Sequence, residues 1–246
     1  MQLIADYHTH SVHSHGTGTV EENVAAARRR GLWAVAITDH GPANLFGLGM
    51  KAPEVLLSIQ KEIQQIEGER PDIRVLAGVE ANIVSGDGDL DVPDDLLRDL
   101  DVVLVGLHPM VRYRSAADAL RLGFLNLAGR ASEALYRRGR ETNTRALEEA
   151  VTRHEVDIVS HPGLHLSIDT ERLAAACAAV GTALEISAGH RYMTPEFVHV
   201  ARAAGAVFAI NSDAHRPEDV GNLEQGLAVA EAADLPAALV LNARHG

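Results

Sequence analysis

Cysteine, aromatic residues and long apolar runs are all scarce in this sequence. Cys177 is the only cysteine among 246 residues, so the chain cannot form an internal disulfide. Its alanine-rich surroundings favour a small packing residue over a nucleophile. Apolar runs such as 102–107 are far shorter than the roughly 18 residues that a membrane span requires. The first residues also lack a basic stretch followed by an apolar one, so we expect a cytoplasmic protein with no membrane partner.

Positive charge is scarce as well. The chain has 22 Lys and Arg against 34 Asp and Glu, which gives a net charge of −12 with neutral histidine. Aromatic residues make up 4% of the chain and are not interleaved with basic ones. This balance argues against a nucleic-acid-binding surface, and we expect no nucleic-acid partner beyond a terminal nucleotide. Hydrophobic residues reach 46%, which excludes a disordered chain and supplies a sizeable core.

Seven apolar runs predict β-strands. They are continuously apolar, a pattern typical of strands that are buried on both faces of a parallel sheet. The runs are 3–8, 33–40, 74–83, 102–108, 157–161, 182–187 and 206–213. Segments with helical periodicity lie between them, at 19–31, 52–69, 141–154, 169–181, 194–205 and 217–233.

Strands and helices alternate along the chain without a linker, a low-complexity segment or a repeat of fixed period. This alternation predicts an α/β fold with a single domain over residues 1–246. We expect a closed or nearly closed β/α barrel of about seven units, with an open doubly wound sheet as the alternative. Residues 110–140 fit neither pattern and predict a long helical connection or an active-site lid after the fourth strand.

Histidine is abundant, with 13 residues, and many of them follow the predicted strands. Functional side chains of a parallel barrel project from these carboxyl ends. His8 and His10 are two positions apart in an extended segment, so both rings can face one ion. A lone histidine at a strand end is more often a polar residue or a helix cap, but nine donors at equivalent positions indicate metal binding. The nine are His8, His10, His15, His40, Glu80, His108, His161, Asp213 and His215.

Nine donors exceed the needs of one ion, since zinc takes about four ligands, so two or three divalent ions are implied. Glu80 lies on a middle strand and is the natural bridge between neighbouring ions. Two or three dications outweigh the charge of two carboxylates, which favours a small anionic substrate such as a phosphate ester. We expect Asp213, His40 and Glu80 to be catalytic.

Seven short motifs resemble, in order and spacing, those of the PHP (polymerase and histidinol phosphatase) family. They are DYHTHSVHSHGTGTVEENVAAA, AITDHGP, GVEANI, VGLHP, VSHPG, LEIS and NSDAHRPEDVG, and they extend from Asp6 to about Gly221. The match looks closest to the stand-alone phosphatase branch that includes the YcdX-like proteins. The resemblance implies a distorted seven-stranded (β/α)7 barrel, similar to a TIM barrel, that holds up to three zinc, manganese or iron ions.

The resemblance also implies how the ligands are shared. One ion would be bound by His8, His10, Glu80 and Asp213, a second by Glu80, His108 and His161, and a third by His15, His40 and His215. A metal-bound hydroxide would attack phosphorus in line, while the ions take up charge on the phosphoryl oxygens. The loop ligand is either His13 or His15, and His15 is favoured because it precedes Gly16 where polymerase-type members usually have Asp.

Several other polar residues are candidates for supporting roles. Arg191 and Arg216 follow strand ends and could grip the substrate phosphate, or could be solvated loop residues. Asp6 and Asp39 could orient ligand imidazoles or cap a turn, and Glu185 could contact a histidine or satisfy backbone groups. A role for His190 is left open, and surface or packing roles are expected for His154, His165, His199 and His245.

Together these features predict a metal-dependent phosphatase or phosphoesterase that hydrolyses a small phosphomonoester, with histidinol phosphate as one candidate. A nucleotide or oligonucleotide phosphodiesterase is the nearest alternative, because polymerase-linked members of the family remove terminal nucleotides. A noncatalytic metal-binding regulatory module is a third hypothesis, although broken ligand sets would be expected for it. The sequence indicates neither the native metal nor the oligomeric state.

Overall fold

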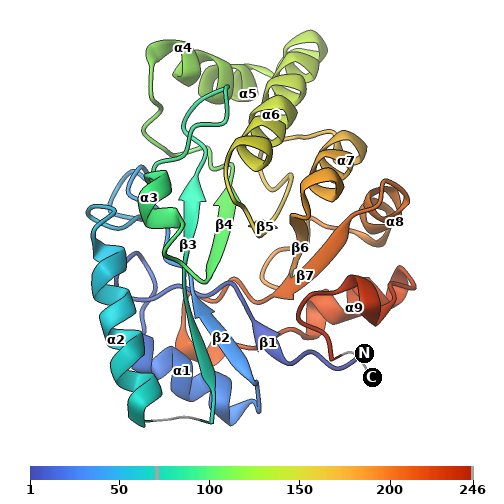
Figure 1. Cartoon of the computed structure of the whole chain (residues 1–246). Coiled ribbons are helices and arrows are strands. Elements are labelled where there is room, and N and C mark those ends of the chain that lie inside the picture. Colours follow the sequence, from blue (N-terminus) through green and yellow to red (C-terminus); the bar gives the residue numbers. More distant parts are fainter. Residues whose placement is uncertain (70–71, 245–246) are drawn as a thin grey trace.

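The computed structural model describes residues 1–69 and 72–244, and its centre is one sheet of seven parallel strands (Figure 1). The strands are β1 (Ala5–Asp6), β2 (Ala34–Ile37), β3 (Arg74–Asn82), β4 (Val102–Gly106), β5 (Ile158–Val159), β6 (Ala183–Ser187) and β7 (Val207–Asn211). Each strand pairs in parallel with the next one in the sequence. This order confirms the predicted seven-stranded barrel, because a doubly wound sheet would reverse its strand order partway.

Helices connect the strands and lie around the outside of the sheet (Figure 1). The α-helices are α1 (Val20–Arg29), α2 (Val55–Glu69), α3 (Asp94–Leu97), α4 (Ala116–Asp118), α5 (Leu125–Ala128), α6 (Glu133–Arg153), α7 (Thr170–Val180), α8 (Pro195–Ala203) and α9 (Glu224–Ala232). A π-helix, η1 (Ala119–Phe124), and two 3-10 helices, η2 (Pro217–Asp219) and η3 (Ala237–Leu239), complete the set for the described residues. No helix in this part of the chain combines the length and the apolar character of a membrane span.

β1 and β5 are shorter than the runs predicted at 3–8 and 157–161, with two residues each. Beyond these strands, backbone N–H groups donate to acceptors outside the parallel strand pairs. The His10 N–H donates to the Ala214 carbonyl, and the His161 N–H donates to the carboxylate of Glu185 at 2.7 Å. The predicted ligands after these strands therefore lie just past the strand ends, where their side chains reach the mouth of the barrel.

Residues 240–243 complete the ring between β1 and β7. The Ile4 N–H donates to the Asn242 carbonyl at 2.9 Å. The fully buried Asn242 side chain accepts from the Ile210 N–H at 3.0 Å and donates to the carbonyls of Ala5 and Ile210. One side-chain amide thus replaces the ladder that a complete strand pair would form, and the barrel is distorted at this seam.

The interior of the barrel changes from apolar to polar along the strands. Leu104, Ile158 and Ala183 belong to a small buried cluster inside the ring. Alternate residues of a strand face the same side, so the position two residues after Ala183 also faces inward. That position is Glu185, which reaches the histidines. The apolar end of the barrel is filled by side chains, and the carboxyl end carries the donors.

The segment 110–140 is a helical connection, one of the two predicted forms. α4, η1 and α5 follow one another, and α6 then begins at Glu133 rather than at 141. The fully buried Leu122 anchors the segment, and the amides of Asn126 and Asn143 donate to each other at 2.8 Å. The connection is therefore packed onto α6.

Candidate metal centre

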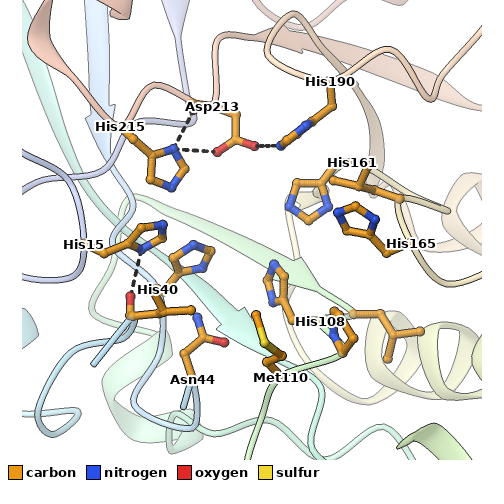
Figure 2. Close-up of a pocket in the computed structure, with 14 residues that line it drawn as sticks. His15, His40, Asn44, His108, Met110, His161, His165, His190, Asp213 and His215 are labelled. Atoms are coloured by element: carbon orange, nitrogen blue, oxygen red, sulfur yellow. Dashed lines mark hydrogen bonds and ion pairs between the residues drawn. The ribbon is translucent and has the colours of Figure 1, made fainter. Parts of the chain in front are cut away.

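The structure brings the nine predicted donors together at the carboxyl ends of the strands, around one cavity of about 250 Å³. Six of them line the cavity (Figure 2), namely His15, His40, His108, His161, Asp213 and His215. The other three, His8, His10 and Glu80, are fully buried and contact the first six. Residues that are up to about two hundred positions apart in the sequence thus meet in one cluster.

Four donors form a compact cage at the base of this cluster. His8 Nε2 lies 3.1 Å from His10 Nε2, 3.3 Å from Glu80 Oε2 and 3.5 Å from Asp213 Oδ1. His10 Nε2 lies 3.1 Å from Asp213 Oδ1 and 3.7 Å from Glu80 Oε2. Ligands of a tetrahedral zinc ion, each about 2.0–2.1 Å from the metal, are about 3.4 Å apart. The five distances that involve His8 or His10 are thus close to those around one tetrahedral ion, and His8, His10 and Asp213 form a set whose donor atoms all lie within 4.8 Å of one another.

Glu80 stands between two groups of histidines and turns one carboxylate oxygen toward each. Oε2 faces the cage and lies 2.7 Å from His40 Nδ1. Oε1 lies 2.9 Å from His161 Nε2 and 3.3 Å from His108 Nε2. A carboxylate whose two oxygens serve different donor groups can bridge two ions, which is the arrangement predicted for Glu80.

The donors nearer the mouth form a continuous cluster of rings. His15 stacks on His40 with 4.9 Å between ring centroids and lies 4.2 Å from His215. Among the described residues, two further sets have donor atoms within 4.8 Å of one another, His10 with His40 and His215, and His40 with Glu80 and His108. These sets divide the ligands differently from the resemblance, because His40 belongs to both of them.

The two histidines of the first loop point to different places. His13 Nε2 lies 2.8 Å from Glu62 Oε1 on α2, outside the cavity. His15 lines the cavity, and its Nδ1 lies 2.9 Å from the Leu48 carbonyl oxygen. The second nitrogen of His15 is thereby left for the centre, so the geometry favours His15 over His13 as the loop ligand.

Burial and charge act in opposite directions on the ionisable groups. Burial would raise the pKa of Glu80, but the surrounding histidines, His40 foremost, hold it well below its ordinary value. Burial would lower the pKa of His161, but the Glu80 carboxylate raises it to about 9. Burial likewise opposes the charge on His8, but Glu185 foremost raises the pKa of His8 well above its ordinary value. Protons on His8 and His161 therefore compete with metal ions for the same nitrogens.

Several donor atoms of the cluster are buried and form no hydrogen bond of good geometry among the described residues, even where two of them, His40 Nδ1 and Glu80 Oε2, lie close together. They are His10 Nδ1, His40 Nδ1, Glu80 Oε2 and His108 Nε2. Leaving a buried polar atom unpaired costs about 1–3 kcal/mol, so such atoms are rare in folded proteins. A cation between these nitrogens and oxygens can bind a lone pair of each of them, so no proton is needed to pair one atom with another. The donor chemistry thus fits divalent ions.

Hydrogen bonds to the second ring nitrogen fix two of the buried or half-buried imidazoles. His8 Nδ1 lies 2.8 Å from Glu185 Oε1, and His108 Nδ1 lies 2.7 Å from Asn82 Oδ1. Each bond leaves Nε2 directed at the cluster, which is how metal-binding histidines are usually held. Glu185 also accepts the backbone N–H of His161, so both roles considered for this carboxylate are present.

Asn82 and Ser160 were not singled out from the sequence. Asn82 orients His108, and the Ser160 hydroxyl donates to Glu80 Oε1 at 2.6 Å. A single asparagine or serine carries no metal signal of its own. Their positions could have revealed them, because Asn82 lies two residues after Glu80 on the same face of β3 and Ser160 directly precedes His161.

Asp6 and Asp39 hold the backbone and do not orient ligand imidazoles. Asp6 accepts the N–H groups of Ser212 and Gly221. Asp39 accepts from both the N–H and the hydroxyl of Ser11 at 2.8 and 2.6 Å. The turn-capping alternative is therefore the right one for both residues, since each carboxylate is occupied by loop donors.

The two arginines predicted to bind phosphate do not line the cavity. Arg216 is exposed and pairs with Asp219 at 2.9 Å and with Glu218 at 3.7 Å. Arg191 is exposed to solvent in the loop after β6. The position of neither arginine supports a substrate role, and that role stays a prediction for both.

Two further histidines line the cavity (Figure 2). His190, whose role was open, has Nε2 3.0 Å from Asp213 Oδ2. His165 was expected at the surface or in packing, and it is exposed, yet it forms part of the cavity wall. Both follow a strand end by a few residues, which is the signal that could have found them. His154 pairs with Asp94, His199 lies on α8, and His245 lies outside the described residues.

The rest of the cavity wall is mostly apolar. Leu48, Leu107, Met110 and Leu164 contribute to it, and no lysine or arginine occurs among the described residues that line it. A phosphate ester bound here would find its positive charge in histidines and metal ions rather than in fixed cationic side chains.

Comparison with known proteins identifies the family. The PHP domain family matches residues 6–194, most of the chain. The chain belongs to the PHP domain family. Its relatives include a protein of Caldanaerobacter subterraneus subsp. tengcongensis named probable phosphatase, which is 32% identical over 252 residues that cover 98% of this chain and 88% of that protein. A protein of the same name from Shewanella sp. strain MR-4 is 31% identical over 254 residues, with 98% and 88% covered. The predicted PHP membership is confirmed.

A solved structure shows the same fold. The histidinol phosphate phosphatase of Lactococcus lactis, in complex with zinc, L-histidinol and phosphate, has a TM-score of 0.68 and 16% sequence identity, with 94% of each chain covered. At this identity the likeness concerns the fold alone. It agrees with the distorted (β/α)7 barrel that the PHP motifs implied.

Proposed function

We propose that this PHP protein is a metal-dependent phosphatase that hydrolyses a small phosphomonoester at a centre of two or three divalent ions. The observation that carries the proposal is the cage of His8, His10, Glu80 and Asp213, in which the two histidine nitrogens lie 3.1 to 3.7 Å from each other and from the two carboxylate oxygens. At this spacing, two imidazole nitrogens and two carboxylate oxygens are better suited to coordinate one cation than to hydrogen-bond to one another.

We assign the ligands to the ions as the PHP resemblance implies. His8, His10, Glu80 and Asp213 would hold one ion, Glu80, His108 and His161 a second, and His15, His40 and His215 a third. Ions in such a centre lower the pKa of water enough to supply hydroxide near neutral pH, and they neutralise charge on the phosphoryl oxygens. Because His8 and His215 meet in this one centre, we treat residues 1–246 as a single domain.

His190 is the side chain we assign to the leaving group. Its Nε2 lies 3.0 Å from Asp213 Oδ2, and its side chain is 39% exposed, so it can exchange protons with solvent. From the edge of the cavity His190 would deliver a proton to the departing alkoxide oxygen.

The cavity favours a small ester over a nucleotide. Its volume is about 250 Å³, and no aromatic ring of Phe, Tyr or Trp occurs among the described residues that line it. Base stacking on aromatic side chains is the usual source of nucleotide affinity. The phosphodiesterase hypothesis therefore lacks a supporting feature in this wall.

Metal analysis and ester turnover test the proposal. We expect purified protein, reconstituted with zinc, manganese or iron, to hold two to three ions per chain and to hydrolyse p-nitrophenyl phosphate faster than bis-p-nitrophenyl phosphate. Glu80→Gln keeps the shape of the side chain but removes the bridging charge, so we expect loss of bound metal and of turnover.

Glu62→Gln is the matched control, because Glu62 pairs with His13 outside the cavity. This variant should retain metal and activity. Preferred turnover of the diester would favour the phosphodiesterase, and full metal content without turnover of either ester would favour a regulatory module.

A further inference from the structure

A second cavity adjoins the metal centre and shares one wall with it. Its volume is about 370 Å³, and His165 lines both cavities. Arg130 and Tyr136, from the turn between α5 and α6 and the start of α6, form one side, and Tyr192, from the loop after β6, contributes to another. A substrate whose phosphate lies at the metal ions can therefore extend past His165 into this space, which we call the Arg130 cavity.

The Arg130 cavity contains a cation and no carboxylate. The chain has 34 acidic residues, yet no Asp or Glu occurs among the described residues that line this cavity. Arg140 nearby on α6 pairs with Asp169 at 2.9 Å, whereas Arg130 forms no ion pair with any carboxylate of residues 1–69 and 72–244. An arginine without a carboxylate partner in a cavity wall can bind an oxyanion through two parallel hydrogen bonds.

Hydroxyl groups accompany the guanidinium. The Tyr136 hydroxyl and the Ser167 hydroxyl are hydrogen-bonded to each other at 2.7 Å, which leaves one O–H of the pair free to donate to a ligand at the wall. Tyr192 packs closely over Gly163, where an added Cβ would lie 2.3 Å from its ring, and it stacks on Phe197. Tyr192 is thus held in place by its neighbours, which lowers the entropic cost of binding a ligand against it.

The positive charge of Arg130 acts on His165, the residue that lines both cavities. Partial burial, then the neighbouring histidines and Arg130, hold the pKa of His165 below its ordinary value. A third cavity of about 330 Å³ also adjoins Asp213, but no lysine or arginine occurs among the described residues that line it. Its carboxylates, Asp213 and Asp219, already pair with His190 and Arg216. The organic part of an anionic substrate is therefore directed to the Arg130 cavity.

We propose that the Arg130 cavity binds the leaving group of the substrate, and that this leaving group carries a second anionic group, a carboxylate or a phosphate, held by Arg130. The inference rests on the proposed phosphatase function. It excludes a preference for esters of amino alcohols, because this cavity offers no carboxylate to a substrate ammonium group. Arg130 is then a residue that determines specificity rather than one that acts on phosphorus.

Matched pairs of esters test the inference on the metal-loaded protein. Glucose 6-phosphate and 6-phosphogluconate differ by a carboxylate, and fructose 6-phosphate and fructose 1,6-bisphosphate differ by a phosphate. We expect kcat/KM to be about tenfold or more higher for the anionic member of at least one pair, as one charge-assisted hydrogen bond allows. The pair that shows the preference identifies the group that Arg130 binds. Phosphoethanolamine, which carries a cation, is expected to be the poorest substrate.

Arg130→Gln should abolish that preference by raising KM for the anionic ester, while the metal content stays that of the wild type. Arg138→Gln is the control, because it removes the same charge from an exposed position of α6 that does not line the cavity. The Arg130 side chain is exposed to solvent, so we expect the variant to fold.

The outcomes separate this inference from the proposed function. Turnover without preference for either anionic ester, a preference for phosphoethanolamine, or equal loss in Arg138→Gln would overturn the assignment of the Arg130 cavity alone. Absence of turnover for every ester in protein with full metal content would overturn the phosphatase proposal, and this inference with it.

Discussion

Glu185 shows how a single buried side chain can set the geometry of several donors. It accepts hydrogen bonds from His8 Nδ1 at 2.8 Å, Asn211 Nδ2 at 2.9 Å and the His161 N–H at 2.7 Å. All three partners are N–H donors. A glutamine here would turn its own N–H toward one of them, so at least one hydrogen bond would become a repulsive contact.

Glu185→Gln is therefore expected to weaken metal binding without removing a ligand. Loss of such a supporting hydrogen bond typically costs about 10–100-fold in metal affinity. Competition with a chromogenic chelator measures the change. Glu148→Gln, which alters a surface pair with Arg172, is the control and should bind metal as the wild type does. Unchanged affinity in Glu185→Gln would show that the ring of His8 is held by other contacts.

His161 gives the metal-free protein a defined pH dependence. Its pKa is about 9 in the folded chain and about 6.5 in the unfolded one, because the Glu80 carboxylate overcomes burial. A raised pKa stabilises the fold fully below pH 6.5, and that contribution is lost as the pH rises through about 9. The pKa of His8 is raised in the same direction.

We therefore expect the melting temperature of metal-free protein to fall between pH 6.5 and 9.5. Thermal unfolding in the presence of a chelator measures it. His161→Gln should flatten the decline, because the titrating group is gone. A metal-free wild type whose stability is constant over this range would contradict the proton competition inferred for the cluster.

At the scale of elements, the strand ends were harder to predict than the strands. All seven apolar runs contain a strand, because burial on both faces requires continuous apolar residues. β1 and β5 are much shorter than their runs, since strand length depends on which backbone groups find a parallel partner. That pairing is decided by the rest of the barrel and leaves no mark in the local sequence.

Helix starts were predictable where the sequence carries a cap. The Thr19 side chain accepts the Glu22 N–H and Glu22 bonds back to Thr19, a capping box that fixes the start of α1. α6 begins eight residues before the predicted position, and no side-chain cap marks its start. The π-helix η1 in the same region likewise follows from packing rather than from a local signal.

Gly106 of β4 links an element to the metal cluster. A Cβ added there would lie 2.4 Å from His108 Cε1, 2.8 Å from Glu80 Oε1 and 2.8 Å from Ser160 Oγ. Glycine at this inward-facing position leaves the space that the donors occupy. A larger residue would displace them without breaking the ladder of β4.

Gly106→Ala is accordingly expected to lower the free energy of unfolding by about 1–3 kcal/mol, as overpacking does, and to reduce metal affinity further. Denaturant unfolding and metal titration measure the two effects. Gly68→Ala on α2 is the control, because an added Cβ there meets no atom within 4 Å and alanine favours a helix. Normal metal binding by Gly106→Ala would contradict the crowding argument.

At the scale of the whole molecule, Asn242 joins the first and last strands of the barrel. Its amide satisfies backbone groups of Ala5 and Ile210 that would otherwise be buried and unpaired. We expect Asn242→Ala to lower the free energy of unfolding by about 2–4 kcal/mol, since several hydrogen bonds are lost inside the protein. Denaturant unfolding measures it, with the exposed Asn222→Ala as control. Equal stability of the two variants would show that solvent can enter the seam.

The sequence predicted the donors of the centre better than its surroundings. Histidines after strands are conspicuous, because the barrel fold tells where strand ends meet. Arg130 and Tyr136 lie in a connection whose path depends on how η1 and α5 pack. Nothing in their local sequence says that they approach His165, so the cavity they form could be found only from the structure.

The cage of four donors draws on both ends of the polypeptide. His8 and His10 come from its beginning, Glu80 from its first half, and Asp213 from a position 203 residues after His10. A fragment that stops before Asp213 lacks a corner of the cage, and one that starts after His10 lacks two. Neither half of the barrel could carry this tetrahedron by itself. Metal content would therefore report on whether two separately expressed halves have reassembled into an intact ring.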